Sequence, residues 1–239
     1  MSLLACGSAA ASSRDVEHTP WDELMERYVA DRTVSYVGIA REQPALERYL
    51  ASLAKTDPAQ LPSNRARLAF WINAYNACVI QGVLDHQPIA SVKDVKGFFD
   101  RLRYRVAGRD LTLNEIEHEG RALGDWRIHF GVVCASKGCP PIRSEAYAAE
   151  WLEAQLTDQL KAFLKNSRDG LRVEGSTLFV SSIFKWYAKD FVQGKLTAEA
   201  LVDVLEPYLD RPVVEAVRGK RLALKFLPYD WSLNAMGRR

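Results

Sequence analysis

The sequence lacks a long apolar run, an excess of one charge and a dense set of cysteines, and each absence excludes a class of protein. No apolar run approaches the ~20 residues that a membrane-spanning helix needs. Lys and Arg total 32 against 30 acidic residues, so the formal net charge of +2 gives no footprint for nucleic acid. Four cysteines in 239 residues do not make a disulfide scaffold. The usual glycine-rich nucleotide cradles are also absent, and we predict no cofactor.

Apolar residues make up 48% of the chain and aromatic residues 10%, which is enough for a sizeable core. Helical and strand patterns follow one another without the regular alternation of a doubly wound fold. We therefore predict one α+β domain over residues 19–239, with several helices packed around a small, mostly antiparallel sheet. Helices are expected within 21–53 and over Arg65–Leu84, Asn114–Leu123, Ser144–Leu164, Ile183–Val192 and Thr197–Leu209, and extended segments at Leu102–Val106, Leu111–Leu113, Arg127–Val133, Leu171–Val173 and Leu178–Val180.

The N-terminal residues 1–18 lack apolar periodicity and are predicted to form a flexible tether. Within them, the sequence Leu-Leu-Ala-Cys that ends at Cys6 resembles the lipobox of bacterial lipoproteins, although no apolar signal region precedes it. A Ser/Ala-rich stretch follows, as it does in lipoprotein tethers. This interpretation predicts a lipid anchor at Cys6 and a location in the cell envelope or periplasm. Without lipidation, the alternative location is the cytoplasm.

Four distinctive blocks occur in order along the chain: RLAFWINAYN at 67–76, LTLNEIEH at 111–118, RIHFGVVCASKGCPPI at 127–142 and PYDWSLN at 228–234. Together with Leu178–Phe191 they resemble domain of unknown function 547, found in many bacterial proteins and in plant proteins fused to leucine zippers. The resemblance covers roughly residues 64–234. The family has no settled activity. The resemblance implies a distant relation to thiol hydrolases, because the central blocks contain an acid, a histidine and a cysteine.

Reactive side chains are concentrated in Arg127–Ile142, and they suggest a thiol hydrolase acting on an amide or thioester bond of a small molecule or peptide. In this hypothesis Cys134 is the nucleophile and His129 its base, because a thiol needs a basic or cationic neighbour to ionise near neutral pH. Glu117 would orient the imidazole. Backbone N–H groups of the Ala135–Gly138 turn, which contains Ser136 as a candidate binding residue, would stabilise the oxyanion.

The predicted strand raises a geometric difficulty for the dyad. Side chains alternate along a strand, so His129 and Cys134 would face opposite sides of it. A bulge at Gly131, or a strand that ends before Cys134, would remove the conflict. Otherwise His118 becomes the better base, and both choices remain open.

Each candidate also has a structural interpretation. Glu117 stands three residues after Asn114, the spacing of a capping box, and so could satisfy a backbone N–H at a helix start. His129 could be a hydrogen-bonded core histidine. Cys134 and Cys139 could form a disulfide, which would favour a non-catalytic binding module and would silence the nucleophile unless the bond is a redox switch.

Zinc is a further alternative, with His118, His129, Cys134 and Cys139 as ligands. Their spacing lacks the usual pair of cysteines separated by two residues, so we predict no metal. Asn73 and Asn76 lie on one face of an apolar helix and are predicted either to pin a neighbouring loop or to line the cleft.

The large polar-tipped residues near the end of the chain have a simpler interpretation. Asp190 and the Tyr229–Trp231 block are interpreted as structural anchors.

Overall fold

The computed structural model describes residues 17–237. The proposed lipid anchor at Cys6 and nearly all of the predicted tether therefore lie outside the described residues. His18 belongs to the fold instead, because it precedes helix α1 (Thr19–Tyr28) and its Nδ1 lies 2.7 Å from the Tyr49 hydroxyl. Within residues 17–237, no helix is both long and apolar enough to cross a membrane.

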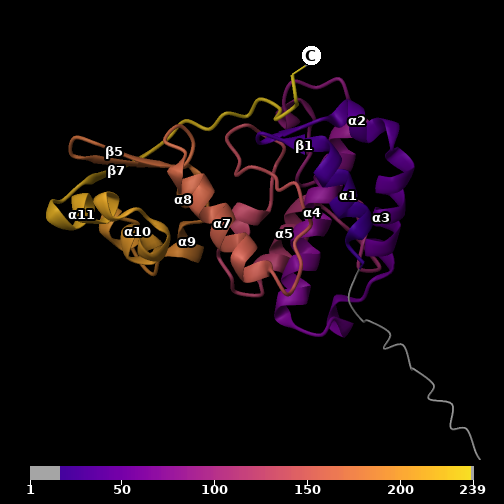
Figure 1. Ribbon diagram of the computed structural model, residues 1–239, viewed down its shortest axis with the longest axis horizontal. Coiled ribbons are helices and arrows are strands. Elements are labelled where there is room, and N and C mark those ends of the chain that lie inside the picture. Colours follow the sequence, from indigo (N-terminus) through magenta and orange to yellow (C-terminus); the bar gives the residue numbers. More distant parts are fainter. Residues whose placement is uncertain (1–16, 238–239) are drawn as a thin grey trace, which may run out of the picture.

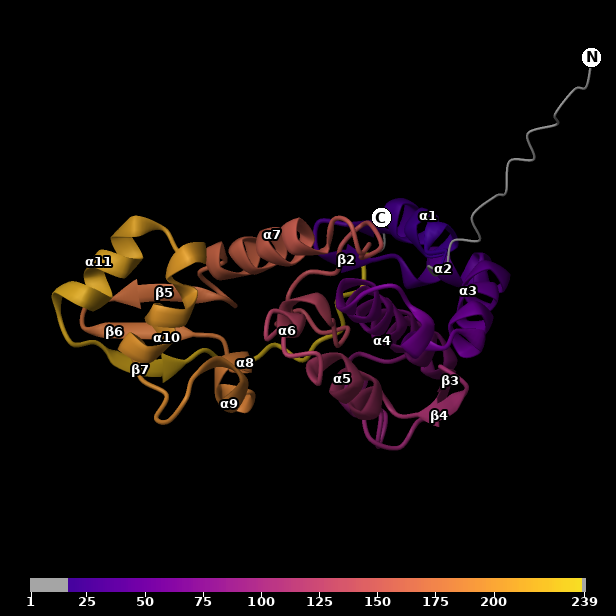
Figure 2. The same cartoon turned by 90° about the horizontal axis from the view of Figure 1, so that it is seen from below.

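The described chain is elongated, with a helical part at one end and a sheet-containing part at the other (Figures 1 and 2). The helical part contains α1, α2 (Tyr36–Arg41), α3 (Gln43–Lys55), α4 (Asn64–His86), α5 (Leu113–Arg121) and α6 (Ile128–Gly131). The sheet part contains β5 (Leu171–Glu174), β6 (Thr177–Val180), β7 (Ala223–Phe226), α8 (Ile183–Trp186), α9 (Ala188–Phe191), α10 (Ala198–Leu205) and α11 (Arg211–Gly219). Helix α7 (Leu152–Lys165) runs between the two parts (Figure 2).

Helix α4 is the central helix of the first part, as its sequence predicts. It begins after Ser63, whose hydroxyl accepts the N–H of Ala66 at 3.1 Å and so satisfies a free donor of the first turn. Sixteen of its 23 residues are buried, which agrees with a helix that is apolar on all sides. The helices expected between Trp21 and Leu53 are also present, and Pro44 lies in the first turn of α3.

The strands of the described residues form three separate small sheets rather than the single sheet that we expected. They are the antiparallel pairs β1–β2 (Val29–Ala30 with Thr33–Val34) and β3–β4 (Tyr104–Val106 with Arg109–Leu111), and the three-stranded sheet β5–β6–β7. Among the strands of residues 17–237, only β6 and β7 pair in parallel, so the α+β class and the mostly antiparallel pairing are confirmed. The β1–β2 hairpin was not predicted, because Asp31 and Arg32 adopt positive φ values of 47° and 68° without a glycine to signal the turn.

The predicted strand at Arg127–Val133 is wrong, because Ile128–Gly131 forms the short helix α6. The side chain of Asp125 accepts the N–H of Arg127 at 3.0 Å and starts the turn. Burial on both sides then favours the helix: Ile128 packs in the core of the helical part, whereas Phe130 packs in the core of the sheet part. Tertiary packing has overridden the strand preference of these residues.

Two predicted helix starts are also misplaced. The capping box at the start of α5 is formed by Thr112 and Glu115, not by Asn114 and Glu117, so Glu117 is free for another role. Helix α7 begins at Leu152 rather than near Ser144, because side chains elsewhere hold the intervening segment in an irregular conformation.

The two hydrophobic cores meet beside α6 and α7. Leu156 of α7 belongs to the core of the helical part and Leu160, one turn later, to the core of the sheet part. Tyr229 packs against both cores. The candidate site lies at this junction. The prediction of a single domain over residues 19–239 stays a prediction.

Candidate active site

The three residues predicted to be catalytic line one cavity of about 280 Å³. Glu117 comes from α5, His129 from α6 and Cys134 from the loop after α6, which also supplies Cys139. The remaining walls are mostly aromatic and include Tyr75, Phe99, Trp186, Tyr187, Tyr229 and Trp231. The structure therefore brings together side chains that lie far apart in the sequence.

The loop that carries Cys134 is fixed by contacts at several points. Upstream of the cysteine, the N–H of Val133 donates to the side-chain oxygen of Asn76 at 2.8 Å. Downstream, the N–H of Gly138 donates to the carbonyl of Asp230 at 2.9 Å. A Cβ at Gly138 would lie 2.8 Å from the backbone nitrogen of Asp230, so only glycine permits this close approach. The thiol is thus presented by a loop pressed against the C-terminal segment.

Hydrogen bonds surround the half-buried Cys134 thiol. Its sulfur lies 3.1 Å from the Tyr229 hydroxyl, and its backbone N–H donates to the sulfur of Cys139 at 3.0 Å. Burial by itself would raise the pKa of Cys134, but hydrogen bonds from Cys139, Ser136 and Tyr229 outweigh burial and lower it. Burial raises the pKa of Cys139. The pair is therefore asymmetric, with Cys134 as the thiol that ionises more readily.

Two of the four backbone N–H groups predicted as oxyanion donors, in the turn after Cys134, are engaged elsewhere. The N–H groups of Lys137 and Gly138 already donate to the carbonyls of Ser232 and Asp230, both at 2.9 Å. The backbone N–H of Ser136 contributes to the lowered pKa of the thiol instead. The Tyr229 hydroxyl, 3.1 Å from the sulfur, is a further candidate donor from a cavity side chain.

The imidazole of His129 is oriented by Asp190 and not by Glu117 as predicted. Its Nε2 lies 2.7 Å from a carboxylate oxygen of Asp190, which also accepts hydrogen bonds of 2.8 and 3.0 Å from Arg121. Tyr187 stacks on the ring with centroids 3.9 Å apart. Burial lowers the pKa of His129 to about 4 despite the opposing effect of Asp190, so the imidazole is neutral near pH 7.

Glu117 lies on the opposite side of the imidazole, at the cavity wall. It is 8% exposed, and its carboxylate oxygen lies 4.0 Å from Nδ1 of His129, which is longer than a hydrogen bond. Burial raises the pKa of Glu117, although a hydrogen bond with Tyr187 opposes the shift. Nδ1 of His129 is buried without a hydrogen-bond partner among residues 17–237 and is therefore available as an acceptor.

Comparison with known families identifies the region that carries these residues. Residues 58–164 match the model of a family described as "Protein of unknown function, DUF547". The chain contains a DUF547 domain. No curated protein and no solved structure matches the chain, so a likeness to thiol hydrolases has no fold match behind it.

The DUF547 match confirms the resemblance over residues 58–164, whereas the predicted extension to residue 234 stays a prediction. Glu117, His129, Cys134 and Cys139 lie inside the matched region. Three neighbours of the site, Tyr187, Asp190 and Tyr229, lie beyond it. No sequence pattern predicts their contacts with His129 and Cys134, because each partner lies at least several tens of positions away along the chain.

Other predicted site residues of the DUF547 domain do not face this cavity. His118 is exposed and lines a separate hollow of about 330 Å³, so it is not placed to act as the base. Asn73 exchanges two hydrogen bonds, of 2.8 and 2.9 Å, with the backbone of Tyr147. Asn76 likewise bonds the backbone on both sides of Val132. Both amides pin a neighbouring segment, as the structural interpretation predicted.

The disulfide and zinc alternatives do not correspond to the structure. Cys78, Cys134 and Cys139 are free thiols. Across residues 17–237, no group of three or more His, Cys, Asp or Glu side chains could hold a metal ion. His118 lines a different hollow from His129 and the two cysteines, so the four predicted zinc ligands do not share one cavity.

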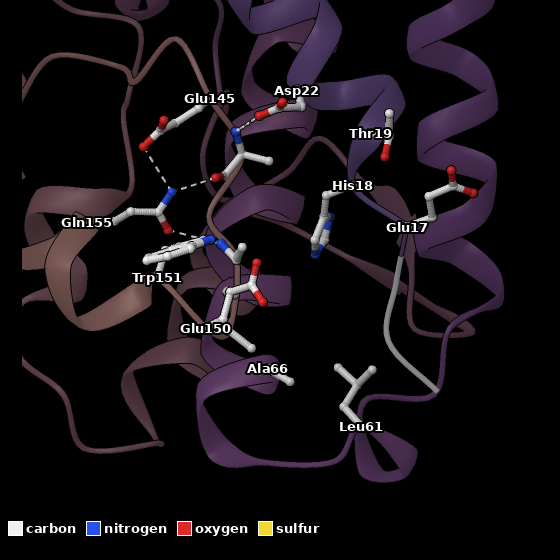
Figure 3. A pocket seen from close by; sticks show the side chains of 14 residues that line it. Glu17, His18, Thr19, Asp22, Leu61, Ala66, Glu145, Glu150, Trp151 and Gln155 are labelled. Atoms are coloured by element: carbon white, nitrogen blue, oxygen red, sulfur yellow. Dashed lines mark hydrogen bonds between the residues drawn. The ribbon is translucent and has the colours of Figure 1, made fainter. Parts of the chain in front are cut away.

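A larger hollow of about 620 Å³ lies at the N-terminal end of the described chain (Figure 3). It contains no cysteine, and its polar groups bond mainly to one another. Asp22 accepts the N–H of Ala146 at 2.7 Å, and Gln155 donates to Glu145 at 3.0 Å. These contacts fix the irregular segment before α7 (Figure 3). The cavity around Cys134 therefore remains the candidate active site.

Proposed function

We propose that this protein is a cysteine hydrolase that cleaves an amide or thioester bond, with Cys134 as the nucleophile. One observation supports this most strongly: a half-buried thiol with a lowered pKa shares a cavity of about 280 Å³ with Glu117 and the neutral imidazole of His129. A thiolate, an acid and a base in one small cavity are the groups that acyl transfer requires.

In the proposed reaction, the Cys134 thiolate attacks the carbonyl carbon of the substrate and forms a thioester with the acyl group. The Tyr229 hydroxyl, 3.1 Å from the sulfur, is released from the thiolate as the bond forms and can donate to the developing oxyanion. Glu117 supplies a proton to the leaving amine or thiol, since its raised pKa favours the protonated form. His129 accepts the proton of the water that later hydrolyses the thioester. Asp190 is a positioning residue that holds the imidazole.

The cavity also suggests the kind of substrate. Its volume of about 280 Å³ is at the lower limit of ligand pockets, and its walls are mainly aromatic. Trp186, 48% exposed, packs at the rim with a ring-centroid distance of 4.8 Å to Tyr229. We infer a small, uncharged, partly apolar acyl group, either from a small molecule or from the end of a peptide.

Turnover of S-phenyl thioacetate, followed by the release of thiophenol, tests the proposal. We expect turnover by the unmodified protein and a loss of about 10³-fold or more in Cys134→Ala, because the nucleophile is removed. Cys78→Ala is the matched control, since Cys78 is buried in α4 and away from the cavity. Circular dichroism would verify that both variants fold. A folded Cys134→Ala protein of undiminished activity would refute the mechanism.

We further propose, from the sequence that ends at Cys6, that the protein acts in the cell envelope through a lipid anchor. Labelling of bacterial cells with radioactive palmitate should mark the full chain but not its Cys6→Ser variant. A full chain without label would contradict the anchor.

A further inference from the structure

Cys134 and Cys139 place two free thiols at one cavity. The backbone N–H of Cys134 donates to the sulfur of Cys139 at 3.0 Å, and both thiols line the same cavity. Neither cysteine belongs to a metal cluster in the part of the chain that the structure describes. Because the Cys139 sulfur lies 3.0 Å from the Cys134 backbone nitrogen, rotation of the Cys134 side chain about its Cα–Cβ bond can bring the two sulfurs together.

The loop between the two cysteines is held in place while its ends carry free thiols. Ser136 pairs with Leu233 in an isolated β-bridge, and the N–H of Lys137 donates to the carbonyl of Ser232 at 2.9 Å. These contacts fix the middle of the loop against the C-terminal segment. The separation of the two thiols is thus set by the fold and does not depend on chance encounters of a flexible loop.

Access to the two sulfurs differs in the way that thiol–disulfide exchange requires. Cys134 is half-buried and opens to the cavity, whereas Cys139 is only 5% exposed. Exchange needs one accessible thiolate to attack an external disulfide and a second, sheltered thiol to displace the product. The lowered pKa of Cys134 and the raised pKa of Cys139 agree with this division of roles.

We propose that Cys134 and Cys139 form a redox-active dithiol that reduces a small organic disulfide and becomes an intramolecular disulfide. The Cys134 thiolate attacks one sulfur of the disulfide, the external S–S bond breaks, and the first thiolate leaves and takes a proton. The Cys139 thiol then loses its proton and attacks the sulfur of Cys134, which releases the second external thiolate, and this thiolate takes up that proton. Two protein thiols are oxidised, and one external disulfide is reduced to two thiols. A dithiol reductant restores the starting state.

This activity does not rest on the proposed hydrolysis, although it uses the same nucleophile. The disulfide form has no free Cys134 thiolate, so oxidation would also stop acyl transfer. The two reactions remain distinguishable, because hydrolysis forms an acyl group on Cys134 and exchange forms a bond to Cys139.

Reaction of the reduced protein with one equivalent of 4,4′-dithiodipyridine tests the proposal. Its aromatic rings suit the aromatic walls of the cavity, and the released thiopyridone is measured by absorbance. All proteins carry Cys6→Ser, so that Cys78, Cys134 and Cys139 are the cysteines left. We expect two thiopyridones per protein, no attached pyridyl group, and a mass about two daltons below that of the reduced protein.

The single variants separate the two roles. Cys139→Ser should release one thiopyridone and keep the other as a mixed disulfide, because the second thiol is missing. Cys134→Ser should react at least about tenfold more slowly, since one pKa unit changes the thiolate fraction tenfold and the remaining thiol is buried. Cys78→Ser should behave as the parent does. A parent protein that releases one thiopyridone and keeps the pyridyl group, or that does not react, would overturn the proposal.

Discussion

The Tyr229 hydroxyl is predicted to account for much of the acidity of the Cys134 thiol, and Tyr229→Phe removes only that hydroxyl. Burial raises the pKa of Tyr229, so the phenol stays protonated and donates to the sulfur 3.1 Å away. A hydrogen bond to a charged group contributes about 1.5–3 kcal/mol, and one pKa unit corresponds to about 1.4 kcal/mol. The variant should therefore raise the pKa of Cys134 by about one to two units.

The pH dependence of alkylation by iodoacetamide measures this shift. Trypsin cuts after Lys137, between the two cysteines, so peptide mass spectrometry reports on Cys134 separately from Cys139. In the unmodified protein the midpoint for Cys134 should lie below the ordinary thiol value of ~8.5, and in Tyr229→Phe it should move upward.

Tyr147→Phe provides the matched control for this experiment. Its hydroxyl is buried and has no hydrogen-bond partner in the described part of the chain, so the same loss of one oxygen should leave the midpoint of Cys134 unchanged. Equal midpoints in the Tyr229→Phe variant and the unmodified protein would show that the phenol does not stabilise the thiolate. An ordinary midpoint in both would also remove the main support for an activated nucleophile.

Two further predictions concern stability. Asn76→Ala leaves the buried carbonyl of Gly131 and the N–H of Val133 without their partner, at about 1–3 kcal/mol each, so urea unfolding should show a loss of stability of about 2–6 kcal/mol. The control Asn64→Ala changes an exposed residue and should alter stability by less than about 0.5 kcal/mol. A loss as small in Asn76→Ala would contradict a stabilising role for the two Asn76 hydrogen bonds. The pKa of His129 is 6.5 in the unfolded chain and about 4 in the folded protein, so the unfolded chain binds the proton more readily. The contribution of the neutral imidazole to the free energy of unfolding is therefore complete above pH 6.5, declines as the pH falls and is lost below pH 4. This decline in the free energy of unfolding amounts to about 3 kcal/mol and is measured by urea unfolding at several pH values. If His129→Gln showed the same pH dependence of stability as the unmodified protein, the assignment to His129 would be refuted.

Elements whose signals are local could be predicted from the sequence. The start of α4 at Ser63, the β5–β6 hairpin and the hairpin turn at Gly108 each depend on residues within a few positions of one another. The concentration of reactive groups in Arg127–Ile142 was also visible, because Cys134 and Cys139 are close in the sequence. A prediction from local signals fails where tertiary packing favours another conformation. In α6, burial against both hydrophobic cores outweighs the strand preference of the residues.

The composition of the candidate site was decided by the tertiary structure. The sequence alone indicated Cys134, His129 and Glu117, but it assigned the orientation of the imidazole to the wrong carboxylate. Asp190 reaches His129 across 61 positions and Tyr229 reaches Cys134 across 95, and no periodicity or cap extends over such separations. Contacts of this kind form only when the two hydrophobic cores pack against each other, since that packing brings distant segments to one cavity.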